Sequence, residues 1–113
     1  MLTINDLREF GANVDEGLGR CLNNEGFYLR LVGKAVADGN FEKLSAAVAA
    51  GDMEGGFEAA HSLKGVLANL ALTPILDPVS RLTELFRHKE EGDYEGLLRT
   101  VLAERDRLLS LME

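Results

Sequence analysis

The chain has 113 residues and a formal net charge of −7, and 46% of its residues are hydrophobic. This length suits a single domain, and this hydrophobic content is too high for a disordered chain. The acidic balance disfavours nucleic acids and anionic membranes as partners, because both require a basic surface. We therefore expect one globular domain over residues 1–113 that binds neither nucleic acid nor membrane.

The only cysteine, Cys21, excludes an internal disulfide framework and fits a reducing compartment. No apolar run approaches the roughly 20 residues that span a bilayer. The first residues carry Asp6 where a signal peptide carries basic residues. The chain contains two prolines and no tryptophan, and its aromatic content is 6%, so aliphatic side chains must form the core. These features predict a cytoplasmic, all-α protein.

Two short helices are predicted first. One is expected to begin at the N-cap Thr3 and to stop near Gly11, and the other to cover residues 15–22. Gly17 and Gly19 weaken the second, since each glycine costs a helix about 1 kcal/mol relative to alanine. We expect this N-terminal segment, residues 1–24, to cover one end of the remaining chain.

Helices with longer apolar stripes are predicted over residues 25–113. Residues 25–50 are expected to form two consecutive helices that make one broken side, and a long helix follows from Met53 to about Ala71. Short gaps between long helices favour antiparallel neighbours. The sequence thus predicts an antiparallel, up-and-down four-helix bundle. One of these helices is expected to start near Asn24, and the expected N-caps of the later ones include Asn40, Asp52 and Asp93.

The start of the helix after Ala71 has two interpretations. Thr73 and Pro74 read as an N-cap followed by proline at the first helical position. Pro78 would then lie inside the helix, where it lacks the N–H that bonds to the carbonyl of residue 74. Alternatively, the regular helix begins with Asp77 as cap and Pro78 as first residue.

One predicted helix, residues 53–72, carries unusual residues on its outward face. On a helical wheel, Leu63, Val66 and Leu70 lie opposite His61 and are expected to face the core. Five residues share the outward face with His61. They are Phe57, Lys64, Gly65, Ala68 and Leu72.

This outward face has the features of a docking surface around a reactive nitrogen. A largely neutral imidazole is nucleophilic at pH 7, and Lys64 lies one turn away, near enough to pair with an anion on the ring. Gly65 costs helix stability and leaves the flank of the ring open to a partner. Phe57 and Leu72 place apolar surface on the same exposed strip.

The run Ala60-His61-Ser62-Leu63-Lys64-Gly65, with its continuation to Leu72, resembles the signature of histidine-containing phosphotransfer (Hpt) domains, and in particular the stand-alone bacterial type. The resemblance extends from about Phe27 to the C-terminus. Many members of the family have glycine where Ala71 stands, and Pro78 is less usual.

The resemblance implies a helical bundle that works in a two-component phosphorelay. His61 would accept a phosphoryl group from an aspartyl phosphate on a receiver domain and pass it to another receiver. These receivers would belong to response regulators or hybrid histidine kinases. Lys64 would hold the phosphoryl oxygens, and Gly65 would give the partner access. Phe57, Ala68, Leu72 and Arg81 complete the expected partner-binding set.

Residues near His61 include only one close carboxylate on the helical wheel, Glu58, so Mg²⁺ is expected on the partner receiver and no cofactor on this chain. Gly55 and Gly56 lack the Gly-Lys-Ser/Thr that completes a nucleotide-binding loop. We therefore expect a phosphoryl carrier without intrinsic kinase activity. With one binding face, the domain is expected to be a monomer.

Two alternatives remain from the residues alone. The chain can be a non-catalytic helical interaction module that binds a partner through the apolar strip around Phe57 and Leu72. A metal site is the weaker alternative, because His61 and His88 lie on different predicted helices without further ligands at suitable spacing.

Basic residues also concentrate on the helix after Ala71, at Arg81, Arg87, His88 and Lys89. They are either a solvated face with cations at the helix C-terminus or a basic edge that meets an acidic receiver pocket. Arg81 is the best-placed candidate for the edge.

Overall fold

The computed structural model describes residues 1–113 as seven α-helices with no strand. None of the helices is both long and apolar enough to cross a bilayer. The predicted all-α helical bundle is confirmed. The helices are α1 (Ile4–Phe10), α2 (Val14–Arg20), α3 (Glu25–Val36), α4 (Asn40–Ala50), α5 (Met53–Asn69), α6 (Thr73–His88) and α7 (Tyr94–Ser110).

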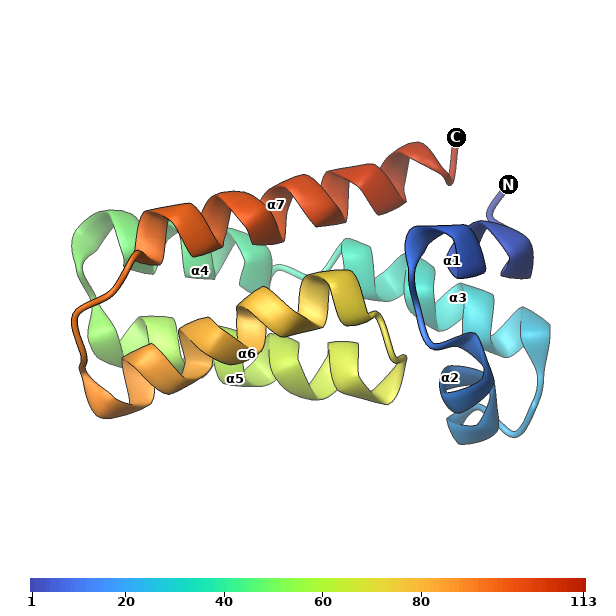
Figure 1. Ribbon diagram of the computed structural model, residues 1–113, viewed down its shortest axis with the longest axis horizontal. Helices are drawn as coiled ribbons and strands as arrows, with labels where there is room; N and C mark the ends of the chain where they lie inside the picture. Colours follow the sequence, from blue (N-terminus) through green and yellow to red (C-terminus); the bar gives the residue numbers. More distant parts are fainter.

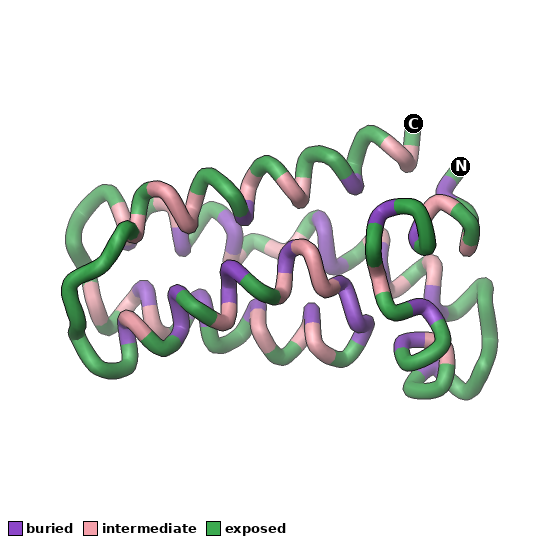
Figure 2. Tube along the Cα trace, in the orientation of Figure 1, coloured by how far each residue is buried: buried purple, intermediate pink, exposed green.

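The helices α4 to α7 run alternately up and down around a common core (Figure 1). α3 and α4 follow each other in nearly the same direction, so together they form the broken fourth side. The bundle is elongated, with principal extents of 39 × 25 × 20 Å. Buried positions lie mainly on the inward side of each helix, and exposed positions on the outward side (Figure 2).

Three predicted N-caps, Thr3, Asp52 and Asp93, are present with their side-chain hydrogen bonds, and Asn24, near the predicted start of its helix, is a fourth cap. Thr3, Asn24, Asp52 and Asp93 each accept a bond from a backbone N–H in the first turn of the following helix. Such caps satisfy N–H groups that have no partner inside the helix. Short polar side chains therefore determine where α1, α3, α5 and α7 begin.

Two predicted caps are wrong by one residue. Asn40 is the first residue of α4, and its backbone N–H donates to Asp38 Oδ1 at 2.8 Å. Thr73 is likewise the first residue of α6, after Leu72 as cap. In α4, the carboxylate of Asp38 bonds the first N–H of the helix, so the helix starts without a capping bond from Asn40.

The helix α6 begins at Thr73 and continues through Pro78, so the alternative start at Asp77 is wrong. Pro78 is buried against the core. Its ring leaves the carbonyl of Pro74 without the usual helical hydrogen bond, near the start of the helix, where such a loss is least disruptive. The first turn closes through N–H bonds from Ile75 and Leu76 to the carbonyl of Leu72.

The helix α5 ends at Asn69, two residues earlier than predicted. Ala71 adopts the left-handed conformation, with φ of 55°, and the N–H of Leu72 bonds to the carbonyl of Leu67 at 3.0 Å. This turn directs the side chain of Leu72 into the core, where none of it is exposed. The predicted place of Leu72 on the exposed strip is therefore wrong, because the helical wheel no longer applies beyond Asn69.

The N-terminal helices pack onto the end of the bundle where α5 stops. The hydroxyl of Tyr28 donates to the carbonyl of Leu70 at 2.8 Å, inside the core. A Cβ at Gly17 of α2 would lie 2.6 Å from that hydroxyl, so only glycine allows α2 to approach so closely. On the other side, Arg107 of α7 donates to the carbonyl of Phe10 at 2.8 Å.

Candidate functional site

His61 lies near the middle of α5, with its side chain exposed to solvent. Five residues on the opposite side of the helix are buried and fix its rotation about its own axis. They are Gly56, Ala59, Ala60, Leu63 and Leu67. A rotation of α5 that buried His61 would expose these residues, so the packing of the core presents the imidazole outward.

Gly56 determines how closely α5 approaches α6. A Cβ on this buried residue would lie 2.3 Å from Cε1 of Phe86, well inside van der Waals contact. The ring of Phe86 therefore occupies the space that any other side chain at position 56 would need. This close contact joins the first half of α5 to the last turn of α6.

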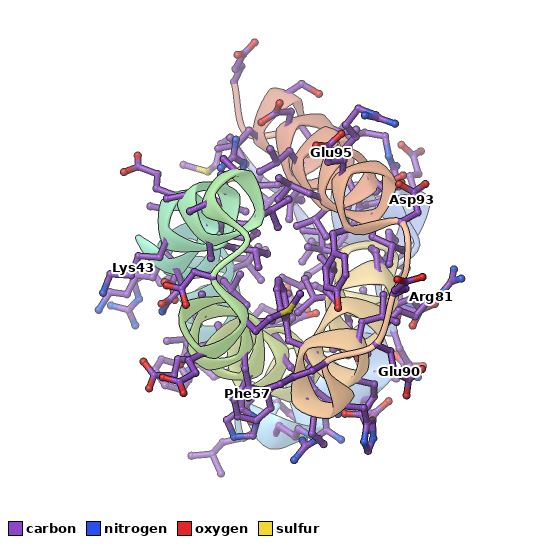
Figure 3. The ribbon with its side chains drawn as sticks, turned by 90° about the vertical axis from the view of Figure 1, so that its left-hand side faces the viewer. Lys43, Phe57, Arg81, Glu90, Asp93 and Glu95 are labelled. Atoms are coloured by element: carbon purple, nitrogen blue, oxygen red, sulfur yellow. The ribbon has the colours of Figure 1, made fainter.

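The ring of His61 stacks on the ring of Phe57, one turn earlier on α5. Their centroids lie 5.3 Å apart, and the ring planes differ by 14°. The guanidinium carbon of Arg87, from α6, lies 5.0 Å from the centroid of Phe57. Figure 3 shows Phe57 on the outward side of α5, next to the end of α6. Phe57 is only partly exposed and has contacts within the chain.

Lys64 and Gly65 follow His61 on the same face of α5. Lys64 is partly exposed and lies close enough to Glu84 of α6 for its charge to affect that carboxylate. The pKa of Glu84 is lowered, first by a hydrogen bond from Arg87 and further by the charges of Arg87, Lys64 and His88. Glu84 is thus an anion among three basic side chains beside the site.

Gly65 has open space where a side chain would be. A Cβ built on this residue would meet no atom within 4 Å. Packing inside the protein therefore gives no reason for glycine at this position, although glycine costs a helix interior about 1 kcal/mol relative to alanine. The space beside the imidazole is available to a molecule from outside.

The C-terminal end of α5 is held by a cation from the N-terminal segment. The guanidinium of Arg20, on α2, donates to the carbonyl of Ala68 and forms an ion pair with Glu16. α5 itself has no basic residue in its last turn. A cation at a helix C-terminus is favourable, because the final carbonyls carry partial negative charge. Ala68 is half-buried and lies at the edge of the exposed face.

Two predicted partner-binding residues lie away from this face. Leu72 is buried, and Arg81 lines an open groove between α6 and α7 with Glu84, Glu90 and Asp93. In Figure 3, Arg81 lies beside α7, on a different side of the bundle from Phe57. Glu84 lines this groove and also bonds to Arg87, whose guanidinium lies near Phe57 on the face of His61. It therefore connects the groove to that face.

The second histidine, His88, is an exposed residue in the last turn of α6, where a cation suits the helix dipole. No three His, Cys, Asp or Glu side chains lie together in a group that could hold a metal ion.

Sequence reasoning missed the contacts that Arg87, Glu84 and Arg20 make at this site. Arg87 stands out in the sequence as part of a basic cluster, but its contact with Phe57 depends on how α5 and α6 are placed along each other. The sequence does contain a signal for Arg20. The last turn of α5 has no basic residue, so a cation from another segment is favoured there.

The model of the Hpt domain family matches residues 34–111, which is well over half of the chain. The chain belongs to the Hpt domain family. No curated protein and no solved structure matches it. Hpt domains transfer phosphoryl groups in phosphorelays and interact there with receiver domains. The matched region contains all of α4 to α7, and it includes His61 with its neighbours on α5.

The match leaves α1, α2 and most of α3 outside the family region. These helices nevertheless supply Arg20 and Tyr28, which bond to the carbonyls of Ala68 and Leu70 at the end of α5. The N-terminal segment is therefore part of the support for the helix that carries His61.

Proposed function

We propose that His61 is the phosphoacceptor of this Hpt domain and that it carries phosphoryl groups between receiver domains. The observation that carries this proposal is an exposed imidazole on α5 whose flank stays open at Gly65. The histidine lies in the matched region of the family, and the packed inner face of α5 holds it toward solvent.

The transfer step is an in-line displacement at phosphorus. A ring nitrogen of the neutral imidazole gives its lone pair to the phosphorus atom of an aspartyl phosphate on the receiver. The bond between phosphorus and the aspartate oxygen breaks, and the aspartate leaves as a carboxylate. The proton on the other ring nitrogen stays in place. The reverse step, toward the aspartate of a second receiver, completes the relay.

Lys64 is proposed to neutralise the phosphoryl oxygens when they reach His61. It lies one turn along the same face, and its charge acts on the carboxylate of Glu84 on α6. An incoming phosphoryl group carries more negative charge than one carboxylate, so it should attract the ammonium group of Lys64 more strongly than Glu84 does. Gly65 leaves room for the receiver to bring its phosphoryl group in line with the ring nitrogen.

The partner is proposed to supply the Mg²⁺ and most of the catalysis. Phosphoryl transfer requires a positioned nucleophile and cations on the phosphoryl oxygens. This chain offers the nucleophile at His61 and one cation at Lys64. We therefore propose a carrier that has no kinase activity of its own.

The test is transfer of phosphate from a charged receiver domain. A receiver labelled on its aspartate is mixed with this protein, and the label on this protein is measured after acid and after alkaline treatment. Phosphohistidine is expected to be labile in acid and stable in alkali. His61→Gln should abolish the label, while His88→Gln, which changes the only other histidine, should still accept it.

A labelled His61→Gln variant would contradict the proposal, as would absence of label from every receiver of the same genome. If the protein accepted no phosphate but still bound a receiver, the remaining interpretation would be a non-catalytic interaction module. The apolar strip expected for such a module is smaller than the sequence predicted, because Leu72 is buried and Phe57 contacts His61 and Arg87.

A further inference from the structure

The stack on His61 extends across two helices. The imidazole lies on Phe57, and the guanidinium of Arg87 lies near the same ring, 5.0 Å from its centroid. His61 and Phe57 come from α5, whereas Arg87 comes from the last turn of α6. The orientation of the imidazole is thus connected through one aromatic ring to a charge on the neighbouring helix.

Arg87 is itself held in place by its own helix. Its Nε donates to Glu84 Oε2 at 2.9 Å, an i,i+3 pair on α6. The lowered pKa of Glu84 has this hydrogen bond as its largest cause, so the carboxylate is an anion at neutral pH. The close packing of Phe86 against Gly56 fixes the distance between the two helices at this level. Arg87 therefore reaches Phe57 from a defined position.

An exposed histidine without such contacts would sample several rotamers. In-line transfer requires the nitrogen lone pair to point at phosphorus, and a small error in that direction lowers the rate strongly. A nearly parallel stack restricts the imidazole to one plane. A cation near the ring of Phe57 favours the ring position that this stack requires.

We propose that Arg87 is a positioning residue for phosphotransfer, which acts through Phe57 to hold the imidazole of His61 in the orientation that in-line attack on a receiver's phosphoryl group requires. This inference rests on the proposed role of His61. It assigns Phe57, which the sequence predicted to contact a partner, and Arg87, for which the sequence left two interpretations open, a role within the chain.

The first experiment observes the imidazole directly, without any receiver. Protons above an aromatic ring are shifted upfield, so the ring protons of His61 should show this shift in NMR spectra of the unphosphorylated protein. Phe57→Leu should remove the upfield shift, and Phe57→Tyr should retain it. Arg87→Gln should reduce the shift. Arg99→Gln, an exposed arginine on α7, is the control and should leave it unchanged.

The second experiment separates positioning from partner binding. With a labelled receiver, Arg87→Gln should lower the transfer rate at saturating receiver by about two- to fivefold, the effect of one exposed cation–π contact. The receiver concentration that gives half the maximal rate should stay the same. Arg87→Lys, which retains the charge, should recover part of the rate. The double variant Phe57→Leu/Arg87→Gln should be no slower than Phe57→Leu alone, because Arg87 acts through that ring.

Three results would overturn the proposal. One is an unchanged NMR shift of His61 in both Phe57→Leu and Arg87→Gln. Another is a higher half-saturating receiver concentration with an unchanged maximal rate, which would make Arg87 a contact to the partner. The third is an additive loss in the double variant. Failure of the proposed function would look different, since the wild-type protein would then accept no phosphate while its NMR shift persisted.

Discussion

Gly56 and Gly65 lie on opposite sides of α5, about two and a half turns apart. Gly56 is buried, and the ring of Phe86 fills the space next to its Cα. Gly65 is exposed, and nothing in the chain lies where its side chain would be. Both residues weaken the helix in the same way, but only the first is compensated by packing within the protein.

This difference separates two kinds of constraint on one helix. The inner face of α5 is fixed by the core, whose side chains leave no room for change. The outer face carries an imidazole, a lysine and an open position that contribute little to the core. Residues on the inner face should therefore affect stability first, and residues on the outer face should affect transfer first.

Gly56→Ala tests the inner face and should have the largest effect on stability. The new Cβ would overlap the ring of Phe86, which also packs against Tyr94 with centroids 4.9 Å apart. We expect a loss of about 2 to 3 kcal/mol in the free energy of unfolding, as for other overpacked cores, measured by urea denaturation.

Phe86→Leu in the same chain should recover part of the stability lost in Gly56→Ala, because the smaller side chain frees the space. An alanine variant at position 56 that is as stable as the wild type would show that the two helices separate easily, and the contrast between the two glycines would disappear.

Tyr28→Phe tests how the end of α5 is held from inside the core. The variant loses the hydrogen bond to the buried carbonyl of Leu70, so it should be less stable by about 1 to 2 kcal/mol at pH 7. Burial, with a smaller contribution from Cys21, raises the pKa of Tyr28 to about 12.

The same pKa predicts how the difference between wild type and Tyr28→Phe changes with pH. The folded pKa of Tyr28 is above its unfolded value of 10.0, so the stability it contributes is complete below pH 10 and is lost as the pH rises toward 12. By pH 11 the wild type should lose about 1 kcal/mol relative to the variant. Urea denaturation of both proteins between pH 7 and pH 11 measures this. A constant difference over that range would contradict the raised pKa.

The sequence predicted the parts of the fold that depend on neighbouring residues. The caps Thr3, Asp52 and Asp93 act within a single turn, so their residue types are sufficient to indicate them. The apolar stripe of α5 likewise predicted which side faces the core, because helical periodicity is local. His61 was placed on the exposed side by the same reasoning, and the structure agrees with that exposure.

The parts that failed depend on contacts between distant segments or on how a helix ends. The position of Leu72 was predicted wrongly because Ala71 adopts the left-handed conformation, so helical periodicity does not continue to Leu72. Glycine tolerates that backbone conformation better than alanine, so an alanine at this position gave no local sign of the turn. The contact of Arg87 with Phe57 depends on the relative placement of α5 and α6, which no local pattern encodes.

Gly65→Ala tests the outer face, and its effect on stability should be the smallest and of opposite sign. Because a Cβ at position 65 meets nothing within 4 Å, the variant should be more stable by about 1 kcal/mol. The same methyl group would occupy the flank of His61, so the transfer rate from a labelled receiver should fall roughly tenfold to a hundredfold.

Gly33→Ala is the matched control for this last prediction. Gly33 lies inside α3, and a Cβ there would make an ordinary contact of 3.6 Å with Met112 Cε. It should therefore gain similar stability without a change in transfer. If Gly65→Ala gained stability and transferred phosphate at the wild-type rate, the open position would have no function toward the partner. A helix that becomes more stable while its protein becomes a poorer phosphate acceptor would instead indicate that glycine at position 65 is retained for the partner's access.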